Sequence, residues 1–274
     1  MPSQSGGFNF NPSSIPTERG LGIEILNYNG DQDFALVTGT GRIGAAISPS
    51  NYEDSFFGNM SFESSTQYLE RKKAGKKYTS NKYAFATAVN LFKNKKSGMK
   101  NLKLNLGLIA KYNADTSKFN WGLGSSLELG YFTVGASKYK DDYYIKDTTI
   151  TPAYEYFERY NVETFTVGIK LPHIIADFTY LNDVFNYYGQ RYDNTISLLT
   201  TTVFWKKWMF TYGHRKEVSF RPYYNFDTEL LETRDIKYES FLGVQYSINK
   251  HFIAGLYNNY YLNRGLTLGL TGFF

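Results

Sequence analysis

Three histidines are the side chains of this sequence best suited to acid–base chemistry or metal binding near neutral pH: His173, His214 and His251. Their spacing matches no metal-ligating motif, and the absence of cysteine excludes thiolate metal sites and disulfides. A hydrolase centred on His214 would need a serine and an orienting carboxylate or amide, and the sequence identifies neither. We therefore expect no enzyme activity, no catalytic residue, no metal and no cofactor. Lipid or peptide hydrolysis that depends on His214 remains a minor alternative.

Charged side chains recur at alternate positions among apolar ones. In residues 101–113, leucine, alanine and tyrosine occupy one parity, while the other holds Lys103 and Lys111 with mostly small or polar residues. Residues 81–92, 119–129 and 164–171 repeat the pattern. A period of two is typical of β-strands, because successive side chains point to opposite faces. These segments are therefore predicted strands with one apolar and one more polar face.

The connections between such segments alternate between two kinds. Short connections fall at residues 40–41, 130–131, 171–173, 205–208 and 249–251. Longer ones, rich in charge and tyrosine, fall at about 49–80, 141–158, 182–193 and 217–236. An up-and-down barrel in an outer membrane has short periplasmic turns and longer external loops, so this alternation favours that class of protein.

Composition agrees with an all-β chain: aromatic residues make up 18%, with 24 glycines and only 7 prolines. No apolar run reaches the roughly 18 residues that a transmembrane helix needs. Counting alternating segments predicts about 14 antiparallel strands, an even number that places both termini on the periplasmic side. The predicted strands lie near residues 20–28, 33–39, 41–49, 80–93, 100–112, 119–129, 131–142, 158–171, 173–182, 193–204, 207–217, 236–248, 251–262 and 264–274.

A soluble β-sandwich would also show alternation, but rows of bare leucine with nothing to cover them disfavour it. We therefore predict a transmembrane up-and-down β-barrel in a bacterial outer membrane, formed by residues 20–274. A charge on the lipid face costs about 2–4 kcal/mol at the bilayer midplane, so the charged parity should face the lumen. The predicted lumen-lining residues are Glu24, Arg42, Lys103, Lys111, Glu128, Lys170 and Asp177. They could line a polar path or pair with one another and fill the lumen.

Residues 1–19 form a separate N-terminal periplasmic segment with too much glycine and proline for a ladder strand. The segment could fold into the lumen as a short plug or stay outside as a tail. We favour the plug, because Phe8, Phe10 and Ile15 need cover.

Three stretches near the N-terminus, residues 11–13, 20–24 and 34–44, resemble the beginning of the FadL/TodX family of hydrophobic-compound transporters. In that family an Asn-Pro-Ala segment lies just before the first strand, and here Asn11, Pro12 and Ser13 occupy that place, with serine in the position of the usual alanine. The resemblance covers about the first fifty residues, and residues 1–19 are much shorter than the family's hatch. It implies a similar barrel, a plug junction at residues 11–13, and substrate leaving sideways at a kinked early strand.

Three glycines, Gly39, Gly41 and Gly44, lie where the predicted second and third strands meet. If the resemblance holds, they let the third strand bend away from its neighbour, since glycine in a strand often marks a kink. The alternative is that they simply form a tight turn.

The chain ends on alternating apolar residues, with Leu266, Leu268, Leu270 and Phe274 on one parity. We expect these residues to form the lipid face of a last strand that pairs with the first strand near residues 20–28 and closes the barrel. The terminal aromatic resembles the signal that outer-membrane assembly machinery reads, so that machinery is an expected partner.

A basic stretch at residues 69–78 and the net charge of +5 permit contact with nucleic acid or with anionic lipid headgroups. In a predicted external loop, lipids and lipopolysaccharide are the expected partners, and we expect no nucleic acid. The leading hypothesis is a channel or transporter for small hydrophobic molecules. The alternative is a structural or adaptor barrel with a closed lumen that binds a partner protein or surface glycolipid.

Overall fold

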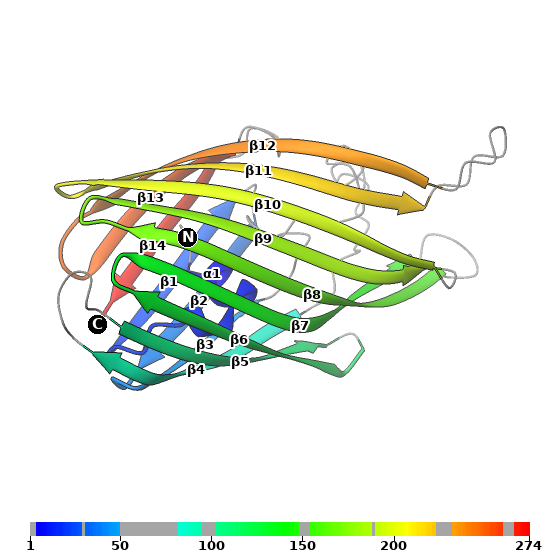
Figure 1. The fold of residues 1–274 in the computed structure, drawn as a ribbon, viewed down its shortest axis with the longest axis horizontal. Coiled ribbons are helices and arrows are strands. Elements are labelled where there is room, and N and C mark those ends of the chain that lie inside the picture. The colour runs from blue at the N-terminus through cyan, green and yellow to red at the C-terminus, as the bar shows by residue number, and fades with distance from the viewer. Residues whose placement is uncertain are drawn as a thin grey trace.

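A computed structural model describes residues 4–28, 31–49, 82–94, 102–114, 116–147, 154–187, 190–222, 232–259 and 266–274. Fourteen antiparallel strands form one closed barrel, in which each strand pairs with its neighbours in sequence and β1 pairs with β14 (Figure 1). The prediction of an up-and-down barrel of about 14 strands is confirmed. The strands are β1 Gly20–Tyr28, β2 Asp31–Gly39, β3 Ile43–Pro49, β4 Lys82–Asn94, β5 Leu102–Asn113, β6 Lys118–Leu129, β7 Phe132–Asp147, β8 Tyr154–Lys170, β9 Ile174–Tyr187, β10 Gln190–Trp205, β11 Trp208–Pro222, β12 Glu232–Ser247, β13 Phe252–Asn259 and β14 Leu266–Phe273.

Two short helical elements precede the barrel, α1 (Gln4–Phe10) and η1 (Pro12–Ser14). Among the described residues, no helix is long and apolar enough to cross a membrane.

The outer face of the barrel is apolar and the inner face is mixed, as the alternation predicts. On β5, Leu106 and Leu108 are 42% and 43% exposed, whereas the intervening parity, which includes Ile109 and Lys111, is buried. Exposed aromatic residues such as Trp205 and Trp208 lie at the short-turn end of the strands. A closed barrel with an apolar outer band and aromatic residues at its edge suits a bilayer, so this is an outer-membrane β-barrel.

Several strands are longer than predicted, and the expected long connections at 141–158, 182–193 and 217–236 are wrong in extent. β7 runs to Asp147 and β8 begins at Tyr154, while Tyr187 pairs directly with Gln190 across the β9–β10 connection. Beyond the bilayer both faces of a strand meet polar surroundings, so the sequence loses its apolar alternation although the ladder continues. The predicted loop at 49–80, with its basic stretch at 69–78, lies outside the described residues except for Pro49.

The closing seam forms as expected. β1 and β14 pair from Gly22 opposite Phe273 to Tyr28 opposite Thr267. The last residue joins the ladder too, because Leu21 N donates to Phe274 O at 2.8 Å and Phe274 N donates to Leu21 O at 2.7 Å. Leu266, Leu268, Leu270 and Phe274 are all exposed on the outer face.

Candidate functional site

The N-terminal segment lies inside the barrel, where α1 sits within the ring of strands (Figure 1). Phe8 and Ile15 are each only 1% exposed. They belong to a buried cluster with inward-facing alanines, whose short side chains leave room in the lumen: Ala35, Ala46, Ala84, Ala86 and Ala88. Burying each large apolar side chain is worth about 1.5–3 kcal/mol, so the apolar residues of the segment hold it in the lumen.

Asn11 organises the turn between α1 and β1. Its side chain caps η1, with Oδ1 accepting hydrogen bonds from Ser13 N at 3.0 Å and Ser13 Oγ at 2.7 Å. Its Nδ2 donates to the main-chain oxygen of Ser125 on β6 at 3.2 Å. Pro12 suits the first position of the turn, because its missing N–H would have no partner there. The three predicted junction residues thus form one unit, bonded to the barrel wall.

Three inward-facing glycines form a seat for this turn: Gly107 on β5, Gly124 on β6 and Gly135 on β7. A Cβ atom on Gly107 would collide with the main chain of Pro12 and Ser13, and one on Gly124 would collide with the Asn11 side chain. A Cβ atom on Gly135 would lie 3.0 Å from Asn11 Nδ2. Only glycine lets the turn approach the wall this closely.

Polar side chains around the glycine seat bind the carbonyls of the segment. Ser13 O accepts hydrogen bonds from Asn105 Nδ2 and Ser126 Oγ, each at 3.4 Å. Phe10 O accepts from Ser137 Oγ and, at 3.5 Å, from Thr164 Oγ1. The N-terminal segment is therefore tied to β5, β6, β7 and β8 by directional contacts as well as by burial.

Three glycines lie at the turn between β2 and β3: Gly39, Gly41 and Gly44. Gly41 has a positive φ of 107°. A Cβ atom on Gly39 would collide with the main chain of Glu18, and one on Gly44 would lie 2.5 Å from Pro16 O.

The pairing of β2 with β3 does not end at these glycines, where the bend was predicted. Gly39 and Gly44 are paired with each other, and the β2–β3 pairing instead stops at Leu36 and Ile47. The alternative of a tight turn therefore describes the three glycines better. Gly39 and Gly44 also leave space for residues 15–18 of the N-terminal segment.

The predicted lumen-lining charged residues lie at different positions along the barrel. Lys103 lies near the short-turn end, 3.3 Å from Glu18 of the N-terminal segment and 3.9 Å from Glu128. Glu24 is buried on the inward parity of β1. Arg42 is a correction, because it is exposed in the β2–β3 turn rather than in the lumen; the expected third strand began too early, and β3 starts at Ile43.

Lys111 lies further toward the external end of the lumen, in a buried ionic cluster. Its Nζ is 2.9 Å from Asp141 Oδ2, and Lys82 Nζ is 3.0 Å from Asp141 Oδ1. A second cluster joins Arg215 to Glu217 at 2.6 Å and to Glu239 at 3.3 Å. These clusters support the interpretation that inward-facing charged side chains pair with one another and fill part of the lumen.

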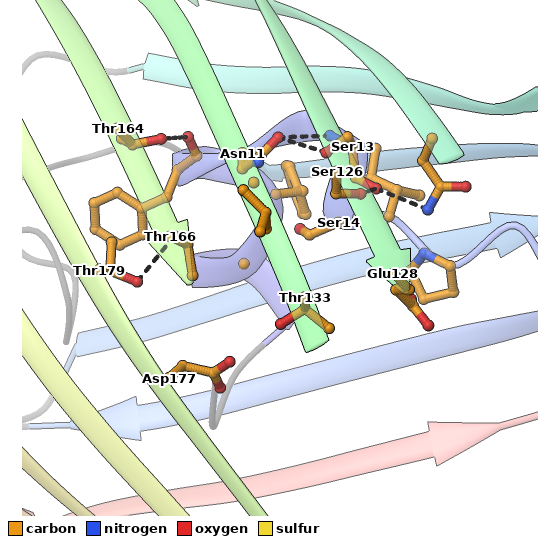
Figure 2. A pocket seen from close by; sticks show the side chains of 18 of the residues that line it. Asn11, Ser13, Ser14, Ser126, Glu128, Thr133, Thr164, Thr166, Asp177 and Thr179 are labelled. Carbon is orange, nitrogen blue, oxygen red and sulfur yellow. Dashed lines mark hydrogen bonds between the residues drawn. The ribbon is translucent and has the colours of Figure 1, made fainter. Parts of the chain in front are cut away.

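A cavity of about 720 Å³ remains beside the N-terminal segment. The segment lines it through Phe10, Ser14 and Ile15, and the rest of the lining comes from strands β5 to β10 with Val37 of β2. Figure 2 shows the hydroxyl-rich wall, where Thr166 Oγ1 and Thr179 Oγ1 are 3.0 Å apart. The charged residues of the lining are Glu18, Lys103, Glu128, Lys170 and Asp177, and its other polar residues include Ser126, Thr133, Thr164 and Thr200.

Much of this site is not predicted from the sequence. The missed residues are Asn105, Gly107, Gly124, Gly135, Ser126, Ser137, Thr164, Lys82, Asp141 and Arg215. One available signal was that glycines recur on the inward parity of adjacent predicted strands, with Gly107 opposite Gly124. Asp141 was missed because it was taken as the border of a loop, whereas it lies inside β7.

His214 lies away from the cavity, on the outward parity of β11. Its Nδ1 is 3.0 Å from Ser240 Oγ, and its ring stacks on Tyr238 with centroids 6.1 Å apart. Within the described part of the chain, no hydrogen bond from the His214 ring to a carboxylate or amide is observed. A histidine–serine pair without an orienting group is an incomplete hydrolytic site.

No protein-family model and no curated protein sequence matches the chain. Among solved structures, a loop L8 deletion mutant of OmpT, an outer membrane protein of Vibrio cholerae, is similar, with a TM-score of 0.46, 10% identity, and coverage of 93% of this chain and 96% of that one. The Pseudomonas putida toluene transporter TodX is similar with a TM-score of 0.45, 10% identity, and coverage of 99% and 92%. A bacterial polysaccharide outer membrane secretin follows with a TM-score of 0.38, 9% identity, and coverage of 94% and 99%. At these identities and TM-scores the likeness assigns neither a family nor a function to this chain.

Proposed function

We propose that the protein passes small molecules across the outer membrane through the cavity beside the N-terminal segment, with residues 4–19 acting as a fixed plug. The observation that supports this proposal is the 720 Å³ cavity between the segment and strands β5 to β10. A lumen packed only for stability would leave few voids of this size.

The lining suggests the chemistry of the solute. Threonine hydroxyls on β8, β9 and β10 line the same cavity as the apolar residues Phe10, Ile15 and Leu198. Such a mixture suits a small molecule with an apolar body and one or two hydrogen-bonding groups. The solute class is thus more polar than the hydrophobic compounds expected from the sequence.

The closed-lumen alternative has its own support in the buried ionic clusters around Lys111 and Arg215. Asp141 lies further toward the external end of β7 than Ser137, which contacts the segment. The Lys111 cluster therefore lies between the cavity and the external end of β7. In a closed-lumen adaptor these ion pairs would stay formed, and no solute would pass.

Liposome swelling with small amphipathic solutes tests the proposal. Thr200→Trp should fill the cavity and lower the swelling rate several-fold, whereas Leu199→Trp, on the outer face of the same strand, should leave it unchanged. Heat-modifiable gel mobility checks that both variants fold. Absence of swelling by the folded wild-type protein with every probe would support the closed-lumen adaptor instead.

A further inference from the structure

The charged residues that line the cavity beside the N-terminal segment fall into two groups. Lys103 lies 3.3 Å from Glu18 and 3.9 Å from Glu128, so these three side chains pair with one another. Lys170 and Asp177 carry opposite charges in the same lining, but no ion pair joins these two residues in the described part of the chain. A solute that carries both a positive and a negative charge can contact both of them.

Asp177 lies in a row of residues that are paired across four strands. Thr133 of β7 lies opposite Gly168 of β8. Asp177 of β9 lies opposite Gly168 on one side and opposite Thr200 of β10 on the other. A Cβ atom on Gly168 would collide with Asp177 Oδ1 and would lie 2.7 Å from Thr133 Oγ1, so the missing side chain leaves room for both groups. Figure 2 shows the side chains of Asp177 and Thr133 pointing toward one another.

The chemistry of this row suits an ammonium group. An ammonium group donates as many as three hydrogen bonds and accepts none, while a carboxylate and two threonine hydroxyls all offer acceptor oxygens. The bond to Asp177 would be charge-assisted and therefore stronger than a neutral one. Asp177 already interacts electrostatically with two ammonium groups, that of Lys170 and that of the amino terminus. This part of the cavity therefore favours positive charge.

Lys170 supplies a cation beside the same row. It pairs with Ile175, which places it two residues from Gly168 toward the short turn, and its side chain is exposed. Diagonal neighbours on one face of an antiparallel pair are roughly 7–8 Å apart, so one small molecule can reach both Lys170 and Asp177. The flexible stem of lysine lets its ammonium group follow a carboxylate bound there.

The apolar part of the lining lies next to these charges. Leu198 is two residues from Thr200 on β10, and it lines the cavity together with Phe10 and Ile15 of the N-terminal segment. An apolar group attached to the charged part of a solute would be buried against these three side chains.

We propose that the cavity binds α-amino acids with an apolar side chain. The ammonium group lies at Asp177 between Thr133 and Thr200, and the carboxylate lies at Lys170. The side chain lies against the apolar part of the lining. This inference rests on the proposed function, because it names the solute class of the same cavity.

Ligand-observed NMR titration of the detergent-purified full chain measures binding separately from flux. The probes are phenylalanine, N-acetylphenylalanine, which lacks the ammonium group, and phenylalaninamide, which lacks the carboxylate. The wild type should bind phenylalanine about tenfold more tightly than either derivative, because each derivative loses a charge-assisted hydrogen bond.

Two variants assign the two charges. Asp177→Asn should weaken the binding of phenylalanine about tenfold without weakening that of N-acetylphenylalanine. Lys170→Gln should weaken the binding of phenylalanine by a similar factor without weakening that of phenylalaninamide. Glu163→Gln and Lys138→Gln make the same chemical changes on the outer face, where both side chains are more than half exposed, and should bind all three probes as the wild type does. Heat-modifiable gel mobility checks that each variant folds.

No binding of phenylalanine, or equal binding of the three probes by the wild type, would overturn the proposal. Unchanged binding of phenylalanine by Asp177→Asn would also overturn it, because the carboxylate would then serve the ammonium groups of the chain itself. Neither result bears on the proposed function, which fails if no small amphipathic solute passes in the liposome assay. Selective binding of phenylalanine without flux would support the amino-acid site and contradict passage.

Discussion

Asn11 lies so close to Gly124 that a Cβ atom on the glycine would collide with Asn11 Oδ1, while Asn11 Nδ2 donates a 3.2 Å hydrogen bond to Ser125 O. The N-terminal segment is therefore fitted against the backbone of the barrel wall. This contact makes the segment part of the folded barrel.

Gly124→Ala should displace the turn at Asn11 and Pro12. Overpacking of this kind costs about 1–3 kcal/mol, so the variant should unfold at lower denaturant concentration and its N-terminus should become sensitive to protease. Gly269→Ala is the matched control, because its Cβ would meet the end of the Leu26 side chain at 3.0 Å, which can move. Equal protease protection in Gly124→Ala and the wild type would contradict the close fit.

Asn11→Ala should remove the cap of η1 and the bond to β6. Loss of a cap costs about 0.5–2 kcal/mol, and release of residues 4–10 should follow. Hydrogen exchange at the amide of Ser13, which now donates to Asn11 Oδ1, measures the effect. Ser14→Ala, at an exposed position of the same turn, should leave that exchange unchanged.

Much of the fold can be predicted from the sequence, because one face of each strand meets lipid and the other meets the lumen. The two faces therefore carry different side chains. Lys103 and Lys111 could be assigned to the lumen from their parity alone, since leucines occupy the other parity of β5. The ends of β7 and β8 could not be predicted from the sequence, because Asp141 and its neighbours lie where both faces of the sheet are polar. The glycine seat was not predicted either, because Gly107 and Gly124 gain their meaning only from the segment that packs on them.

Leu104→Arg should lower the amount of assembled barrel, because it places a charge on the lipid-facing parity of β5 near its short-turn end, at a cost of about 1 kcal/mol. Lys103→Ala should be tolerated, since its contacts with Glu18 and Glu128 are partly exposed ion pairs worth about 0.2–1 kcal/mol. The folded fraction in outer-membrane extracts measures both. Equal tolerance at the two positions would contradict the assigned facing.

Deletion of Phe274 should lower the amount of assembled barrel. The residue contributes two main-chain hydrogen bonds to Leu21 and an edge-on ring contact with Phe252 at 5.7 Å between centroids. Phe274→Leu keeps the main-chain bonds, so comparing the two variants separates the seam from a signal read from the aromatic ring. Normal assembly of the deletion variant would count against both roles.

Passage of solutes through the cavity beside the N-terminal segment can be tested by thiol labelling, because the chain contains no cysteine. Thr179→Cys places one thiol on the cavity wall, and Phe178→Cys places one on the outer face of the same strand. Single-channel or liposome flux should fall sharply when Thr179→Cys reacts with a bulky thiol reagent, and should stay constant for Phe178→Cys. Unchanged flux through fully labelled Thr179→Cys would show that solutes do not pass through this cavity.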